Sequence, residues 1–130
     1  MKKVLIAILL STSMAYAQTQ PKSSIPAPTK ITTGLTYQQL LPGNGGRSTL
    51  TVQNNQTTTD NCFMILGGPW QVGDTTATTR IINGVSLTAQ QASILLLPGG
   101  SDNRLSGIVP TDQILVTCTT TGDSIYADYQ

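Results

Sequence analysis

The sequence has no histidine and no glutamate, and only 10% of its 130 residues are charged. Without histidine, neither a Ser-His-Asp nor a Cys-His catalytic arrangement can form, because both need imidazole as the general base. Without glutamate, aspartate alone supplies carboxylates for acid–base chemistry. The chain is therefore predicted not to be an enzyme, and we expect no catalytic residue and no cofactor.

Aspartate occurs mainly in contexts that are typical of turns. Most of these residues lie beside Gly, Asn, Thr or Ser, where an aspartate side chain accepts hydrogen bonds from the backbone of a turn. They are Asp60, Asp74, Asp102, Asp112 and Asp123. A small hydrolase is the alternative interpretation, and it would need two of these carboxylates side by side in the fold.

Basic residues are equally scarce. Residues 18–130 carry five of them against six aspartates, which gives a net charge near −1. Such a surface has no basic footprint for nucleic acid and no polybasic patch for a membrane. The expected partners are proteins, either further copies of the chain in a homo-oligomer or a capsid or envelope lattice.

Residues 1–17 have the three parts of a secretory signal peptide. The positive region KK, the apolar run VLIAILL and the cleavage site AYA occupy residues 2–3, 4–10 and 15–17. The apolar run is shorter than the roughly 20 residues that a spanning helix needs. We expect cleavage before Gln18 and export to the periplasm or the extracellular space. A retained N-terminal anchor is the alternative.

The remaining chain divides into an arm and a domain. Residues 18–33 are rich in Pro, Ser and Thr and show no apolar periodicity, which predicts an extended arm or a disordered tail. Residues 34–130 are rich in threonine, a good strand former, and poor in the strong helix formers glutamate and lysine. This composition predicts a single all-β domain.

Alternating and apolar segments within the domain predict individual strands. Leu50 and Val52 alternate with polar residues, which is typical of a strand buried on one face. Residues 62–66 are apolar throughout, as in a central strand, and Asn83-Gly84 is a strong hairpin signal. Strands are expected within residues 34–41, 47–54, 62–66, 80–87, 93–97, 113–119 and 124–129. About seven short strands with this spacing indicate a small antiparallel β-sandwich or a jelly-roll-like barrel.

The chain has two cysteines, Cys62 and Cys118. An even number of cysteines behind an export signal favours a disulfide, and both residues can point into one core from their strands. A bond closing a loop of this length would stabilise the fold by about 4 kcal/mol in the chain-entropy model. Two buried free thiols are the alternative. No metal site is predicted, because two cysteines without histidine give too few ligands for zinc. A calcium site at residues 101–103 or at Asp123 is the alternative, since oxygen ligands in loops suit Ca²⁺, but no D-x-D spacing supports it.

Several polar residues are candidates for contact with a partner. Four of them are expected on the outward face of the second predicted strand: Arg47, Thr49, Thr51 and Gln53. Arg104 is one of few cations outside the arm, and it should pair with an aspartate or with another subunit. A solvated surface arginine is the alternative.

Trp70 is the only tryptophan and follows the sequence Gly-Gly-Pro. An exposed tryptophan on a loop can stack on a sugar or on a protein partner. Alternatively, the ring caps the open end of a sandwich.

Short motifs in residues 34–130 resemble a known class of proteins. These are a Gly-rich turn before Arg47 and the segments LTVQNN, SILLLPGGS, VPTDQILVTC and GDSIYADY. Together they resemble small β-sandwich accessory proteins that tailed bacteriophages encode. The resemblance implies an architecture and no specific site.

The resemblance also implies a function. Such proteins are attached to virion heads or tails as decoration or accessory proteins and have no catalytic activity. We therefore expect a non-enzymatic structural or interaction protein, on the virion if the gene is from a phage. Most virion proteins assemble in the cytoplasm, whereas this chain has an export signal. The alternative is therefore an exported periplasmic or cell-surface binding protein, either adhesin-like or a factor that excludes phage.

Overall fold

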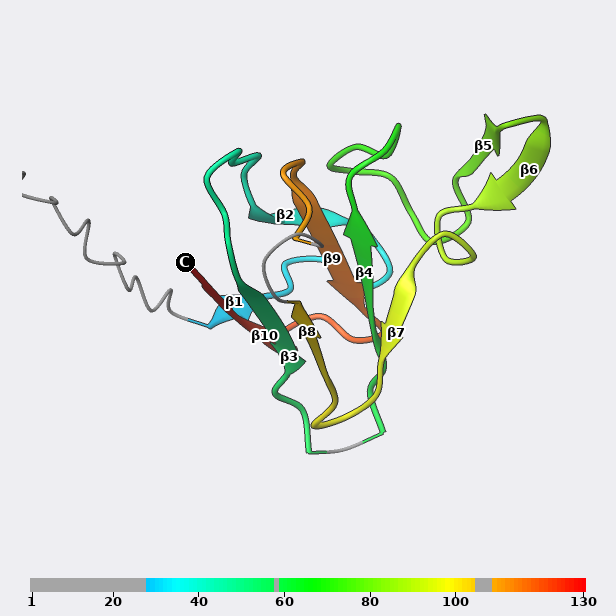
Figure 1. Ribbon diagram of the computed structural model, residues 1–130. Helices are drawn as coiled ribbons and strands as arrows, with labels where there is room; N and C mark the ends of the chain where they lie inside the picture. The colour runs from blue at the N-terminus through cyan, green and yellow to red at the C-terminus, as the bar shows by residue number, and fades with distance from the viewer. Residues whose placement is uncertain (1–27, 58, 105–108) are drawn as a thin grey trace, which may run out of the picture.

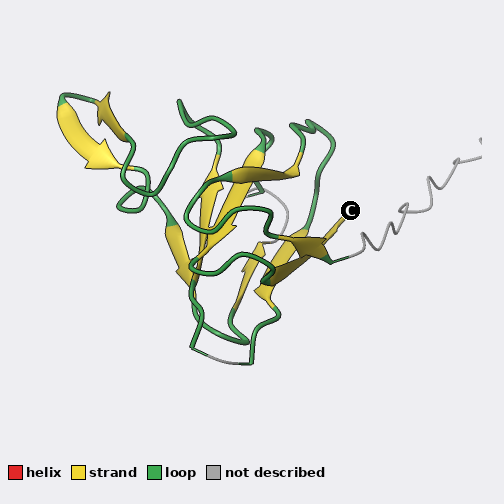
Figure 2. Cartoon of the chain, turned by 180° about the vertical axis from the view of Figure 1, so that it is seen from behind, coloured by secondary structure: helices red, strands yellow, loops and turns green. Residues whose placement is uncertain are grey.

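The computed structural model describes residues 28–57, 59–104 and 109–130. The predicted signal peptide and most of the predicted arm lie outside these residues. The described residues form strands and loops without any helix (Figure 2). The strands are β1 (Thr29–Lys30), β2 (Gln38–Leu41), β3 (Leu50–Asn54), β4 (Cys62–Leu66), β5 (Thr79–Ile82), β6 (Val85–Thr88), β7 (Ile94–Leu96), β8 (Ser101–Arg104), β9 (Ile114–Cys118) and β10 (Ser124–Tyr129).

Eight of these strands form two antiparallel four-stranded sheets (Figure 1). One sheet has the strand order β1-β10-β3-β8 and the other has the order β2-β9-β4-β7. The remaining strands, β5 and β6, form a hairpin that projects away from both sheets. The predicted all-β class is thus confirmed, with a sandwich-like arrangement of the two sheets.

The alternating side chains of the strands build the core between the sheets. In β3, Leu50, Val52 and Asn54 are buried, whereas Thr51 and Gln53 between them are partly exposed. Strand β10 follows the same alternation with Ile125 and Ala127. Both sheets contribute to one apolar cluster: Ile31, Leu41, Leu50, Val52, Cys62, Met64, Leu96, Ile114, Val116, Cys118, Ile125 and Ala127.

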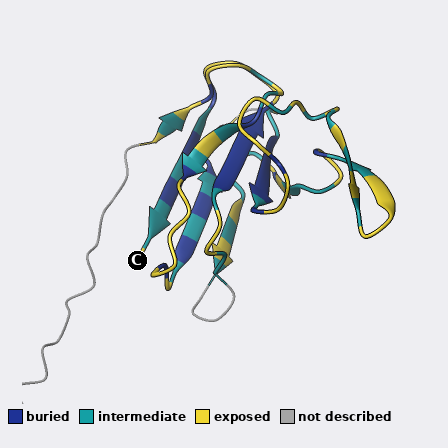
Figure 3. Ribbon diagram, turned by 90° about the horizontal axis from the view of Figure 1, so that it is seen from above, coloured by how far each residue is buried: buried dark blue, intermediate teal, exposed yellow. Residues whose placement is uncertain are grey.

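A second apolar cluster covers the other side of β4 and β9. We call residues 67–93, which connect β4 to β7, the insert. Its loops bring Trp70 and Ala89 onto the outer face of the second sheet, where the cluster consists of Tyr37, Phe63, Ile65, Trp70, Ala89 and Leu115. Strands β4 and β9 are therefore buried on both faces, as Figure 3 shows. The predicted central position of residues 62–66 is confirmed.

Several boundaries differ from those expected. Strand β1 lies within the predicted arm and pairs with β10, and Ile31 is 1% exposed in the core, so the domain begins before residue 34. The first predicted strand starts later, at Gln38, because the backbone of Tyr37 is hydrogen-bonded to Gly73 and Asp74 of the insert. Strand β8 was not expected, since its sequence SDNR is entirely polar. The described strands number ten where about seven were predicted.

The hairpin predicted at Asn83-Gly84 is confirmed. Ile82 and Val85 are partners at its end, and the two turn residues have φ of 51° and 80°. Both angles fit the turn that suits a two-residue hairpin.

Candidate functional site

The outer face of the β1-β10-β3-β8 sheet collects the polar residues that were predicted to contact a partner. Thr51 lies between Asp128 of β10 and Asn103 of β8 in the ladder, and Gln53 lies between Tyr126 and Ser101. Residues directly opposite in a ladder share one face. We call the set Thr51, Gln53, Ser101, Asn103, Tyr126 and Asp128 the open face.

Thr49 extends the open face at one end. Its backbone exchanges hydrogen bonds with Gln130, at 3.2 and 3.3 Å, which continues the ladder between β3 and β10. The structure thus brings three of the predicted contact residues, Thr49, Thr51 and Gln53, onto one side of one sheet. The alternation in the sequence correctly predicted that these three residues share one face. Their neighbours on β8 and β10 could be identified only from the strand order of the sheet.

The open face offers hydroxyl groups, amides, one phenol ring and one carboxylate. Its members on β3 and β10 are partly exposed, and those on β8 are exposed. The Oδ1 atom of Asp128 is buried without a hydrogen-bond partner among the described residues. A surface of this kind suits a partner that makes many polar contacts, because it presents donors and acceptors at the regular spacing of the strands.

Arg47 is not on this face, so its predicted exposure is wrong. It is 6% exposed and donates hydrogen bonds to the carbonyl oxygens of Pro42 and Pro110, at 2.8 and 2.7 Å. Its guanidinium also lies 5.6 Å from the ring centre of Tyr129. Burial lowers the pKa of Arg47. The side chain connects the loops at Pro42 and Pro110 with Tyr129 of the C-terminal strand. Its role is structural.

Trp70 is also buried, at 3% exposed, so the predicted contact through this side chain is wrong. The guanidinium of Arg80 lies 5.6 Å from the centre of its ring. Arg80 in turn donates to both carboxylate oxygens of Asp74, at 3.0 and 2.8 Å. The alternative that Trp70 caps the open end of the sandwich is also wrong, because the ring covers apolar residues on the outer face of the second sheet.

The Asp74 carboxylate anchors the insert. Partial burial by itself would raise the pKa of this carboxyl group. Hydrogen bonds from Arg80 and from the Gln71 backbone, together with the Arg80 charge, outweigh that effect, so the pKa is lower than its usual value. The ionised carboxylate is therefore the form that the folded chain prefers.

Arg104 was predicted to pair with an aspartate or with another subunit, and the structure shows a pair with an aspartate. Its Nε atom lies 2.7 Å from Oδ2 of Asp102, two residues earlier in β8. Its ladder partner is Leu50, whose side chain is buried between the sheets, so Arg104 is on the opposite side of β8 from the open face. Its contact with a partner stays a prediction.

Exposed apolar side chains occur elsewhere, and the sequence interpretation did not single them out. On the projecting hairpin, Ile81 is 77% and Val85 is 55% exposed. On β7 and just after it, Leu95 and Leu97 are 50% and 57% exposed. The hairpin is thus a second place at which a partner could bind.

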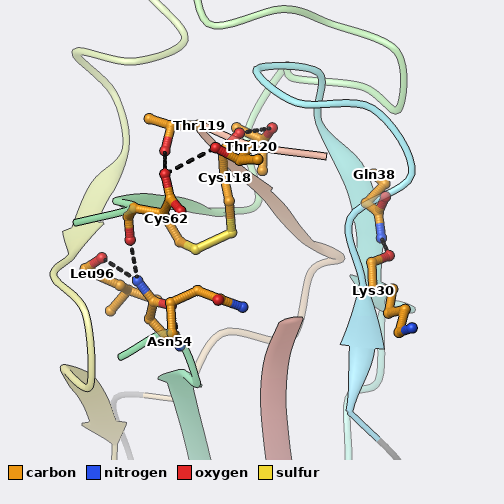
Figure 4. The surroundings of a disulfide bond; sticks show 11 residues. Lys30, Gln38, Asn54, Cys62, Leu96, Cys118, Thr119 and Thr120 are labelled. Atoms are coloured by element: carbon orange, nitrogen blue, oxygen red, sulfur yellow. Dashed lines mark hydrogen bonds between the residues drawn. A yellow bond between two sulfur atoms is a disulfide. The ribbon is translucent and has the colours of Figure 1, made fainter. Parts of the chain in front are cut away.

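The predicted disulfide joins Cys62 and Cys118 (Figure 4). The two residues are directly opposite each other in β4 and β9, and both are fully buried. A backbone hydrogen bond from Thr119 to Asn61, at 3.0 Å, holds the next pair of residues together. The bond therefore links two strands of one sheet that are already hydrogen-bonded.

Asn54 is a buried polar residue beside the disulfide, and the sequence interpretation missed it. Its amide nitrogen donates to the carbonyl oxygens of Leu96 and Asp60, both at 3.0 Å, and its side-chain oxygen accepts from the Gln56 backbone at 3.0 Å (Figure 4). Asn54 thereby ties β3 of one sheet to β7 of the other. The burial of Asn54 could have been predicted from the sequence, because position 54 continues the inward alternation of Leu50 and Val52.

Asp123 is the second missed residue, and it lies in the same region. It is 6% exposed, and a carboxylate oxygen lies within 4.8 Å of both sulfur atoms. Burial raises the pKa of Asp123, as does the charge of Asp60, and a hydrogen bond from the Thr120 backbone only partly offsets these effects. Its position next to Gly122 made it resemble a solvated turn residue.

No match was found among models of protein families, curated proteins or solved structures. The resemblance to phage accessory proteins therefore depends on its short motifs alone. In the part of the chain that the structure describes, no helix is long and apolar enough to cross a membrane.

Proposed function

We propose that this chain is a non-catalytic β-sandwich protein of an oxidising compartment that acts by binding a partner through its open face. The difference between the two outer sheet faces carries the proposal. One outer face is covered by the insert and its apolar cluster, whereas the other presents Thr51, Gln53 and Tyr126 at its centre. The uncovered face leaves its hydroxyl and amide groups accessible to a partner, whereas the insert blocks access to the other outer face.

The disulfide supports the proposed location. Disulfides persist in exported proteins and are rare in reducing cytoplasm. Together with the predicted signal peptide, the bond between Cys62 and Cys118 favours a periplasmic, cell-surface or extracellular protein. The N-terminus of the protein purified from its native source tests this location. Cleavage before Gln18 is expected, and an intact Met1 would contradict it.

The arrangement of charged groups supports a role without catalysis. Asp74 and Asp102 are engaged by neighbouring arginines, and Asp123 is buried next to the disulfide. These positions suit structural roles better than attack on a substrate, which requires an accessible reactive group.

The binding surface can be tested by charge insertion. Thr51→Arg and Gln53→Arg place bulky cations at the centre of the open face, and Ile81→Arg places the same charge on the hairpin. The purified variants are compared for self-association by analytical ultracentrifugation and for binding to cell-envelope fractions. We expect the two open-face variants to lose binding and the hairpin variant to keep it. The reverse result would move the binding site to the hairpin.

A second candidate is the virion accessory role that the sequence resemblance implies. It shares the non-catalytic binding function and differs in the partner, which would be a capsid or tail lattice. Its support is the set of motifs in residues 34–130. Mass spectrometry of purified virions should then detect the chain in stoichiometric amount. Recovery from host periplasm alone would reject this candidate.

A further inference from the structure

Three potential metal ligands meet in the interior of the sandwich. The sulfur atoms of Cys62 and Cys118 and a carboxylate oxygen of Asp123 lie within 4.8 Å of one another. All three residues are buried. They come from β4, from β9 and from the turn before β10, so only the fold brings them together.

The carboxylate of Asp123 is poorly satisfied in this position. Its Oδ2 atom is buried and has no hydrogen-bond partner among the described residues, and the residue is 6% exposed. An unpaired carboxylate oxygen in a protein interior is costly and calls for an explanation such as a redox role or an ion. The nearby Asp60 adds a second negative charge that a cation would offset.

We propose that reduction of the disulfide converts Cys62, Cys118 and Asp123 into a binding site for a thiophilic divalent cation such as zinc. A dithiol or phosphine reductant supplies two electrons, the sulfur–sulfur bond breaks, and each sulfur takes up a proton. The metal ion then displaces both thiol protons to solvent and binds two thiolates and the carboxylate. The oxidised protein has no free thiolate and should not bind the metal.

The fold supports this ligand set after the bond is broken. Strands β4 and β9 are paired over five residue positions, so their backbone hydrogen bonds hold the two cysteines opposite each other without the disulfide. In a tetrahedral zinc site, bond lengths of about 2.3 Å to sulfur and 2.1 Å to oxygen separate the ligand atoms by about 3.6–3.8 Å. The carboxylate oxygen and the sulfur atoms, which lie within 4.8 Å of one another, can reach this spacing once the two bonded sulfur atoms separate. Three protein ligands leave the fourth position for water.

This ligand set could not be predicted from the sequence, because the count of zinc ligands included only cysteine and histidine. Asp123 lies five residues after Cys118 in a turn, and nothing in that spacing places its carboxylate beside Cys62. The inference does not depend on the proposed binding function of the open face.

The experiment titrates cobalt(II) into the protein after reduction with a phosphine and anaerobic removal of the reductant. We expect one cobalt ion per chain, a sulfur-to-cobalt charge-transfer absorption, and displacement of the cobalt by zinc. The oxidised protein should give no such absorption. Far-ultraviolet circular dichroism monitors the fold in the same samples.

Asp123→Asn tests the carboxylate, and Asp112→Asn, at an exposed position before β9, is the matched control. Loss of even an outer-shell partner weakens metal sites by about 10–100-fold, so Asp123→Asn should weaken cobalt binding at least tenfold, whereas the control should match the wild type. Cys62→Ser should abolish the charge-transfer band of a two-thiolate site. If the reduced protein unfolds, cobalt should restore its circular dichroism.

Three results would overturn the proposal. They are a reduced protein that binds no cobalt, an Asp123→Asn variant that binds it as tightly as the wild type, and an unfolded reduced chain that cobalt does not refold.

Discussion

The two sheets have similar inner faces and very different outer faces. On the β2-β9-β4-β7 sheet, Phe63, Ile65 and Leu115 point outward into the apolar cluster under the insert. On the β1-β10-β3-β8 sheet, Thr51 and Gln53 point outward and remain partly exposed. Strand composition follows from this difference, because a strand covered on both sides needs apolar residues at most positions, whereas a strand with one open side needs them only at alternate positions.

The insert is what makes the two outer faces different. It connects β4 to β7, which are neighbours in the same sheet, and uses residues 67–93 where a short turn would be enough. It is fastened by polar contacts as well as by Trp70. The Tyr37 hydroxyl hydrogen-bonds the Ala89 carbonyl at 3.3 Å and the Ser93 hydroxyl, and Arg80 pairs with Asp74. The comparison predicts that substitutions under the insert are costly and that those on the open face are tolerated.

The largest difference should come from the two large aromatic residues. Trp70→Ala removes a buried ring and should lower the free energy of unfolding by about 3–5 kcal/mol. Tyr126→Ala, at the centre of the open face, should lower it by less than about 1 kcal/mol. Urea denaturation followed by circular dichroism measures both. Equal losses would show that the insert does not act as a cover.

Asn54 tests the interior that both sheets share. Asn54→Ala leaves the carbonyl oxygens of Leu96 and Asp60 without the amide donor and should destabilise the fold by about 2–3 kcal/mol. Asn103→Ala on the open face is the control, with an expected change within about 0.5 kcal/mol. The same denaturation experiment applies, and a neutral Asn54→Ala would contradict a role in joining β3 to β7.

The attachment of the insert can be probed without removing any apolar surface. Tyr37→Phe deletes the hydroxyl that binds Ala89 and Ser93 and should cost about 1 kcal/mol. Tyr126→Phe should be neutral. Amide hydrogen exchange should quicken around Ala89 in the first variant only. Faster exchange across both sheets would instead indicate a global effect.

The carboxylate of the insert should stabilise the fold when it is ionised. The pKa of Asp74 is lowered in the folded state, so its contribution is present above the unfolded value of about 3.9 and is lost as the pH falls through the folded value. Asp74→Asn should therefore lower the melting temperature at neutral pH. The difference from the wild type should shrink as the pH falls below about 4. A difference independent of pH would point to packing alone.

Asp123 should behave in the opposite way. Its pKa is raised in the folded state, so the folded chain binds more protons than the unfolded chain above a pH of about 3.9, and stability falls as the pH rises through that window. Asp123→Asn should raise the melting temperature of the oxidised protein at neutral pH, and the gain should fade toward pH of about 4. A variant less stable than the wild type at neutral pH would contradict the direction of the shift. This test does not involve a metal ion.

The elements that could be predicted from sequence are those set by local patterns. The alternation around Val52 predicts a strand with one buried face, and Asn83-Gly84 predicts its turn, because side-chain period and turn geometry depend on adjacent residues. The disulfide was predicted from two cysteines behind a predicted export signal. Strand β8 could not be predicted from its polar sequence, because it is a strand by virtue of pairing with β3 at the edge of a sheet.

Only part of the candidate site could be predicted, because the rest depends on contacts between residues far apart in the chain. Thr51 and Gln53 were placed on an outward face, but Arg47 was wrongly placed there. Its burial depends on a carbonyl acceptor at Pro110, 63 residues away. Trp70 was left with two alternatives, since nothing local shows whether a loop folds back over a sheet.

The sequence by itself determined that the chain is all-β and which residues of its regular strands face inward, and it favoured a disulfide between its two cysteines. These properties depend on backbone propensity, the two-residue period of a strand and the number of thiols. Only the tertiary structure decided which outer face is covered, which arginines are buried, and that Asp123 lies beside the disulfide. Those outcomes depend on contacts between residues far apart in the chain, and such contacts leave no periodic trace in the sequence.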